Sequence, residues 1–170
     1  MYMRRAVGSG GARSAQDAGS MWTVVILNYI GTFLAILAAF RLPTAVFPNR
    51  VVVFWLGIVV LIAGSLLRRH CFRMLGQYFT YDVRVREEQP VIERGAYRWI
   101  RHPSYTAGTL MFVGIGLAFG NWISLLVLTA IIIAGYLYRV RIEERALLAS
   151  LGDRYRDYMR RTRRFIPFVI

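Results

Sequence analysis

The chain has 170 residues, of which 56 % are hydrophobic, whereas an ordinary soluble domain has roughly 45–50 % apolar residues. Charged residues make up 18 % of the chain and are clustered, so that long segments carry no charge. This composition excludes intrinsic disorder for most of the chain and predicts a membrane protein.

The net charge is +13, because 22 arginines and no lysine oppose 9 acidic residues. Nucleic acid is a common partner of so basic a chain. Here the mean hydropathy is +0.44 and the arginines flank apolar segments, so we expect contact with anionic membrane lipid and no nucleic-acid partner.

The chain has a single cysteine, Cys71, which excludes an intramolecular disulfide. The spacing of cysteine and histidine does not match a zinc site, so we expect no metal. We interpret Cys71 as a small apolar residue near a helix end, with acylation of a juxtamembrane cysteine as the alternative.

The N-terminal half contains two segments long enough to cross a bilayer. Residues 1–20 are rich in glycine and arginine and predict a flexible arm. Residues 21–40 carry no charge over a length that suits a membrane helix, and residues 51–67 form a second uncharged segment after Pro43 and Pro48.

The C-terminal half contains a second pair of uncharged segments, residues 104–119 and 122–138. Only Gly120 and Asn121 separate them, which predicts a tight helical hairpin. The predicted fold is therefore all-α: a multi-span membrane helical bundle of about four transmembrane helices, forming one domain over residues 21–170.

The segment after the last span predicts a cytoplasmic amphipathic region. A helix continues from Arg139 with an apolar stripe that includes Leu147 and Leu151. Gly152 predicts a break, and residues 153–160 predict a second short helix lying on the membrane surface.

The arginines predict the orientation of the bundle. Four spans place 20 arginines on one side of the membrane and only Arg41 and Arg50 on the other. By the positive-inside rule, both termini and the active site are expected in the cytoplasm, and we expect a bacterial inner membrane protein. The spans 104–119 and 122–138 cover about 24–26 Å, so their flanking polar residues should lie at the lipid boundary.

Two groups of residues carry candidate chemistry at this boundary. His102 precedes Pro103, which suits the first turn of a helix, and the free N–H groups there favour an anion. Alternatively, Arg101 and His102 extend toward the lipid headgroups. Arg139 and Glu143 are four residues apart and share a helix face, where an ion pair is the simplest interpretation.

These residues belong to a wider pattern. It comprises residues 95–105, the hairpin, and then Arg139, Arg141, Glu143, Glu144, Leu151, Gly152, Tyr155, Tyr158 and Pro167. The pattern resembles the isoprenylcysteine carboxyl methyltransferase family and its phospholipid methyltransferase relatives over roughly residues 60–167. Many relatives have glycine two residues after the motif tyrosine, whereas this chain has Ala107 there and Gly108 next.

The resemblance implies an integral membrane enzyme that takes a methyl group from S-adenosyl-L-methionine. No GxGxxG motif is present, as expected for a pocket unlike that of soluble Rossmann methyltransferases. The implied cofactor region covers residues 89–105 and 139–158, and Arg139 is implied to be catalytic and to face the substrate. The implied cofactor-binding residues are Gln89, Pro90, Val91, Ile92, Tyr97, His102, Pro103, Ser104, Tyr105 and Glu143.

The resemblance implies a lipophilic or lipidated acceptor with a carboxylate, as in isoprenylcysteine. A carboxylate needs no general base. A phospholipid amine, a small thiol or a phenolic lipid is the alternative. An amine or phenol requires a proton acceptor, for which His102 is the evident candidate in the motif. A membrane scaffold or transporter subunit is the non-enzymatic alternative, but the spans show neither internal charges nor a repeat.

Overall fold

The computed structural model describes residues 19–79 and 89–165, so most of the predicted flexible arm and the apolar end after Phe165 lie outside the described residues. The described residues form helices and no strands, apart from two isolated β-bridges. The helices are α2 (Ser20–Arg41), α3 (Arg50–Leu75), η1 (Gly76–Tyr78), η2 (Gly95–Arg98), α4 (Pro103–Ala118), α5 (Trp122–Leu151) and α6 (Asp153–Arg161).

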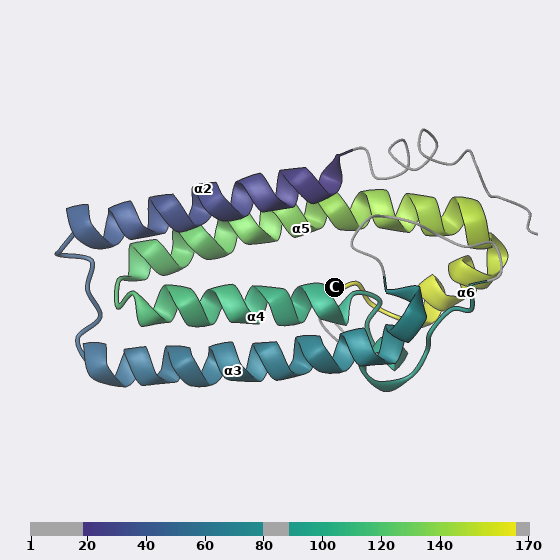
Figure 1. The fold of residues 1–170 in the computed structure, drawn as a ribbon, viewed down its shortest axis with the longest axis horizontal. Coiled ribbons are helices and arrows are strands. Elements are labelled where there is room, and N and C mark those ends of the chain that lie inside the picture. Colours follow the sequence, from purple (N-terminus) through teal and green to yellow (C-terminus); the bar gives the residue numbers. More distant parts are fainter. Residues whose placement is uncertain (1–18, 80–88, 166–170) are drawn as a thin grey trace, which may run out of the picture.

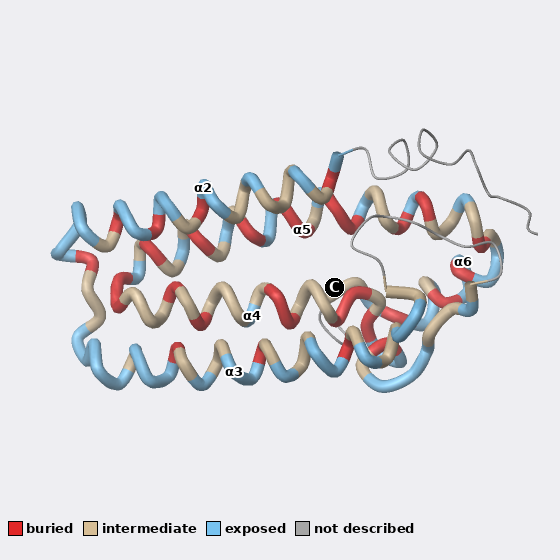
Figure 2. The backbone as a smooth tube through the Cα atoms, in the orientation of Figure 1, coloured by how far each residue is buried: buried red, intermediate tan, exposed pale blue. Residues whose placement is uncertain are grey.

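The four long helices lie side by side (Figure 1). α3 packs along α4, α4 along α5, and α5 along α2, while the short helix α6 follows at one end. Many large apolar side chains on the outer faces are exposed, for example Phe33 (65 %) and Val59 (61 %). Figure 2 shows such exposed positions along α2 and α3. These faces require lipid rather than water, so the predicted helical membrane bundle is confirmed.

Among the described residues, three helices are long and apolar enough to cross a membrane: α2, α3 continued by η1, and α5. α4 has 16 residues, a length of about 24 Å, so the count of four spans stays a prediction. α5 joins the predicted last span and the following cytoplasmic helix into one continuous helix, and Gly152 breaks it as expected.

Small residues let the helices approach closely. A Cβ atom on Gly57 of α3 would lie 2.6 Å from the Gly114 carbonyl oxygen of α4. On α2, Gly31 and Ala35 are buried, and a Cβ on Gly31 would lie 3.2 Å from Ile131 of α5. The small-residue spacing therefore serves packing within one bundle. Cys71 is fully buried, as expected of an apolar filler.

Hydrogen bonds join two connections at one end of the bundle, which we call the loop end. The Phe47 N–H donates to the Gly120 carbonyl oxygen (3.0 Å), and the Trp122 N–H donates to that of Ala45 (2.9 Å). The Asn121 side chain donates to the Leu42 carbonyl oxygen (2.9 Å). The opposite end, which we call the pocket end, contains the start of α4, the last turns of α3, and α6.

Candidate active site

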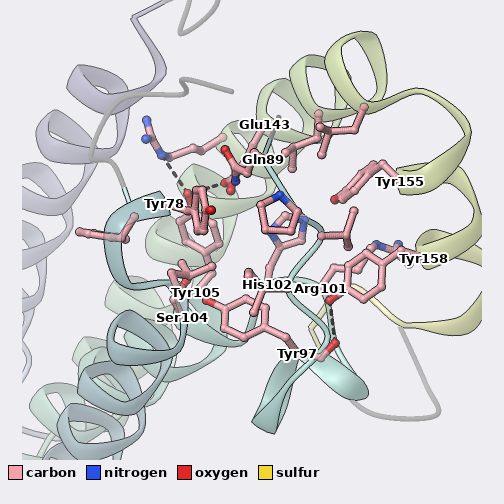
Figure 3. Close-up of a pocket in the computed structure, with 18 residues that line it drawn as sticks. Tyr78, Gln89, Tyr97, Arg101, His102, Ser104, Tyr105, Glu143, Tyr155 and Tyr158 are labelled. Atoms are coloured by element: carbon pink, nitrogen blue, oxygen red, sulfur yellow. Dashed lines mark hydrogen bonds between the residues drawn. The ribbon is translucent and has the colours of Figure 1, made fainter. Parts of the chain in front are cut away.

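A cavity lies at the pocket end, between the end of α3, the start of α4, α5 and α6 (Figure 3). Eight of its lining residues were not among the predicted site residues: Leu75, Tyr78, Phe79, Arg101, Leu147, Leu151, Tyr155 and Tyr158. The predicted residues in the lining are Gln89, Pro90, Val91, Ile92, Tyr97, His102, Ser104, Tyr105, Arg139 and Glu143. Pro103 does not line the cavity. It is buried and forms the first turn of α4, with His102 at the N-cap, as the sequence predicted.

Arg139 and Glu143 are connected through a third side chain. The Arg139 Nε atom donates to the Tyr105 hydroxyl (2.9 Å), and this hydroxyl donates to the Glu143 carboxylate (2.8 Å). Figure 3 shows Tyr105 and Glu143 beside the cavity. Arg139 and Glu143 therefore lie close together, as their spacing predicted. The Tyr105 hydroxyl connects them by hydrogen bonds, which the helix spacing did not predict.

Arg139 is a charged residue in a long apolar helix, and it is only 7 % exposed. Its Nη1 atom donates to the Ser20 hydroxyl (2.9 Å), and Ser20 is the fully buried first residue of α2. Side chains from α4 and α2 thus fix the guanidinium at two of its nitrogens. A buried cation in such a place requires partners or a task.

Glu144 organises the other side of the cavity and was not predicted as a site residue. It is 3 % exposed. Its carboxylate accepts from the Arg101 Nε atom (2.9 Å), lies 3.3 Å from the His102 Nε2 atom, and pairs with the Arg164 Nη2 atom (2.8 Å). Arg101 and His102 therefore point into the protein, and the alternative in which they extend toward lipid headgroups is wrong.

The segment after α6 lies against the residues that precede α4. The Arg101 N–H donates to the Arg163 carbonyl oxygen (2.7 Å), and the His102 N–H donates to that of Arg164 (3.0 Å). The Thr106 hydroxyl donates to the Phe165 carbonyl oxygen (2.8 Å). These bonds and Glu144 hold the segment at the cavity wall. The sequence pointed to Glu144 through its place beside Glu143 in the family-like pattern, and through the small number of acids, nine in the chain.

The short helix predicted at residues 153–160 is α6, and its aromatic face packs against the protein, while its position on the membrane surface stays a prediction. Tyr155 and Tyr158 are each 3 % exposed and contact Leu151, because the aromatic face of α6 is its only apolar face. The Tyr158 hydroxyl donates to the Tyr97 carbonyl oxygen (2.7 Å). Burial raises the pKa of Tyr158, and the nearby Glu93 carboxylate adds to this, so the phenol stays a neutral donor.

The hydroxyl group of Tyr97 is buried in the wall of the cavity. The Tyr97 hydroxyl lies beside the Ser104 side chain, without a hydrogen bond of ordinary geometry between them. Burial raises the pKa of Tyr97, so the hydroxyl remains protonated.

Comparisons with known proteins agree with these observations. Residues 52–154 match the model of the phospholipid methyltransferase family. The chain is 28 % identical to protein-S-isoprenylcysteine O-methyltransferase B of Arabidopsis thaliana, covering 72 % of this chain and 65 % of that protein. It is 30 % identical to protein-S-isoprenylcysteine O-methyltransferase of Tribolium castaneum, covering 76 % of this chain and 48 % of that protein.

The fold is similar to a solved structure of the eukaryotic intramembrane Ras methyltransferase, isoprenylcysteine carboxyl methyltransferase. The TM-score is 0.59 at 25 % sequence identity, with 96 % of this chain and 55 % of that chain covered. The chain thus spans between about half and two thirds of the length of these three proteins.

Proposed function

Because the chain belongs to the phospholipid methyltransferase family, we propose that it is an integral membrane enzyme that transfers a methyl group from S-adenosyl-L-methionine to a lipophilic acceptor. The observation that carries the proposal is the cavity, which brings the segment 89–92, the motif around His102 and the α5 residues Arg139 and Glu143 to one place.

The cavity fits the proposed cofactor in its donors and acceptors. The Ser104 hydroxyl in the cavity lining offers a hydrogen-bond donor. The Glu143 carboxylate faces the cavity as an acceptor suited to an ammonium or a ribose hydroxyl. Apolar side chains such as Val91 and Leu147 provide surface for an adenine ring. When bound, S-adenosyl-L-methionine supplies an electrophilic methyl group on a sulfonium.

Arg139 is proposed to orient the acceptor. Its planar guanidinium suits a carboxylate, and the contacts with Tyr105 and Ser20 fix its direction. A carboxylate needs no proton acceptor, so holding it at the correct distance and excluding water would supply most of the rate.

An isoprenylcysteine-like carboxylate is therefore the proposed acceptor, with a phospholipid amine, a small thiol or a phenolic lipid as the alternative. An amine or a phenol must lose a proton when it is methylated, and the sequence indicated His102 as the residue that would accept this proton. The His102 Nε2 atom is directed at Glu144, which leaves Nδ1 as the proton acceptor that an amine or a phenol would require.

Calorimetry on the detergent-solubilised protein tests the cofactor site. Replacing His102 or Glu143 with alanine should weaken binding of S-adenosylmethionine or its demethylated product at least tenfold, a loss of about 1.4 kcal/mol each. Glu93→Ala is the matched control, because Glu93 is an exposed acid that does not line the cavity. Unchanged affinity in both cavity variants would disprove the assignment. Methyl transfer to an isoprenylcysteine analogue and to phosphatidylethanolamine then compares the acceptors.

A further inference from the structure

A shallow groove lies between α3 and α4, outside the cavity. Its lining is Ser65, Arg68, Arg69, Phe72, Arg73 and Met111, none of which lines the cavity. The five α3 residues recur at intervals of three and four and so form one stripe along the helix. The α3–α4 pair forms the edge of the row of helices (Figure 1).

The groove concentrates positive charge without a compensating acid. Arg69 and Arg73 are exposed and have no ion-pair or hydrogen-bond partner among the described residues. Neither α3 nor α4 contains an aspartate or a glutamate. Three guanidinium groups within six consecutive residues of one helix repel one another, and a bound anion relieves this repulsion.

Arg68 is held in place before any ligand binds. Its Nη1 atom donates to the Tyr136 hydroxyl of α5 (3.4 Å), and its guanidinium lies over the Phe72 ring, 5.4 Å from the centroid. The contact passes Gly108 of α4, where a Cβ atom would lie 2.8 Å from Arg68 Nη1 and 2.6 Å from the Tyr136 hydroxyl oxygen. A side chain at position 108 would collide with both groups, so Gly108, which follows Ala107, allows Arg68 to reach Tyr136.

The groove also offers apolar surface and lies where lipid is available. Phe72 and Met111 contribute apolar side chains to the lining. One and two turns earlier on α3, Leu66 and Ile62 are 64 % and 53 % exposed, as expected of lipid-facing positions. A ligand that matches this surface has an anionic head and an apolar tail.

We propose that this groove binds the phosphate headgroup of an anionic membrane phospholipid, with Arg68, Arg69 and Arg73 holding the phosphate and Phe72 and Met111 contacting the acyl chain. Guanidinium groups bind phosphate oxygens in a bidentate fashion. Each arginine near an anionic lipid surface contributes enough to change the affinity by about fivefold. The site is independent of the proposed methyl transfer, because it shares no residue with the cavity.

Native mass spectrometry of the full chain in neutral detergent tests the proposal, with phosphatidylglycerol, phosphatidylcholine and glycerol 3-phosphate as probes. The test variant is Arg69→Gln with Arg73→Gln. The control is Arg94→Gln with Arg98→Gln, which removes the same charge from exposed residues next to the end of α3. A third variant, Arg69→Lys with Arg73→Lys, keeps the charge.

We expect phosphatidylglycerol to bind about 25-fold more weakly to the test variant and less than twofold more weakly to the control. The lysine variant keeps the charge but lacks the bidentate guanidinium, so it should retain only part of the affinity and still bind more tightly than the glutamine variant. Equal losses in the test and control variants would overturn the proposal, since they would indicate a general effect of surface charge. Equal binding of phosphatidylcholine, or equally tight binding of glycerol 3-phosphate, would also overturn it.

Discussion

At the scale of single residues, Arg139 is the side chain whose environment most clearly separates a catalytic role from a structural one. Arg139→Ala should keep the fold and cofactor affinity and lower kcat by about 100-fold, because orientation of the acceptor acts on the reacting geometry. Arg139→Lys should restore only part of the rate, since an ammonium lacks the planar fork. Melting temperature and single-turnover methylation of the same sample are the measurements. A destabilised Arg139→Ala protein with full turnover per folded molecule would remove the catalytic role.

Ser20 is expected to act through Arg139. Its hydroxyl accepts from Arg139 Nη1 at 2.9 Å, and hydrogen bonds to charged groups contribute about 1.5–3 kcal/mol. Ser20→Ala should therefore lower kcat by about tenfold without changing the cofactor Kd, and Ser20→Thr should restore most of the rate.

A second buried serine gives the control for Ser20. The Ser124 hydroxyl donates to the Ala35 carbonyl oxygen (2.6 Å) and joins α5 to α2 far from the cavity. Ser124→Ala should lower the melting temperature and leave kcat per folded molecule unchanged. If both alanine variants changed only the melting temperature, Ser20 would have a structural role.

The sequence predicted much of the candidate site because several of its residues are close together along the chain. Arg139 and Glu143 are one helical turn apart, and residues 97–105 form a continuous motif. Ser20 could not be predicted in the same way, because it is 119 positions from Arg139. Only the packing of α2 on α5 brings the two side chains together.

At the scale of elements, Glu144 joins α5 to the start of α4 and to the segment after α6. Its partners Arg101, His102 and Arg164 are 43, 42 and 20 positions away. Removing one member of a buried charge cluster leaves the others unpaired, at a cost of about 3–5 kcal/mol. Glu144→Gln should therefore lower the melting temperature by several degrees, as measured by fluorescence in detergent.

The exposed Glu93 supplies the matched comparison. It pairs with Arg161 at 3.1 Å, but both side chains are largely exposed (40 % and 61 %), and such pairs contribute little. Glu93→Gln should leave the melting temperature nearly unchanged. If Glu144→Gln and Glu93→Gln changed the melting temperature equally, Glu144 would not hold the three segments together.

The ends of helices were predicted well where the chain changes to turn-forming residues and poorly where only the charge changes. Residues 104–119 correspond to α4 (Pro103–Ala118), which starts at Pro103 and is followed by the positive-φ Gly120. The uncharged span predicted at residues 51–67 ends before Arg68, whereas the helix that contains it, α3, continues to Leu75, beyond the helix end expected near Cys71. Arginine is a good helix former, so a cluster of arginines ends a membrane span without ending the helix.

At the scale of the whole molecule, hydrogen bonds fix which connections share an end of the bundle. The 42–47 connection is bonded to the turn at residues 120–122, so both lie at the loop end. The start of α2 and the start of α4 lie at the pocket end, where Ser20 contacts Arg139 and Tyr105 contacts the same arginine. α4 therefore runs between the same two ends as α2 and α3, although it has only 16 residues.

This arrangement predicts that α4 crosses the membrane with the other three helices and that the pocket end faces the cytoplasm. About 24 Å of helix is slightly less than a hydrocarbon core of about 30 Å, so both ends of α4 should lie just inside the interfaces. The arginine distribution of 20 to 2 gives the direction.

Cysteine labelling in a Cys71→Ala background tests this topology. Thr44→Cys and Trp122→Cys mark the loop end, whereas Gln77→Cys and Arg156→Cys mark the pocket end; all four positions are exposed. A membrane-impermeant maleimide should label the first pair in intact cells and the second pair only after permeabilisation. If Trp122→Cys were instead labelled together with Gln77→Cys, α4 would not cross the membrane and the four-span topology would be wrong.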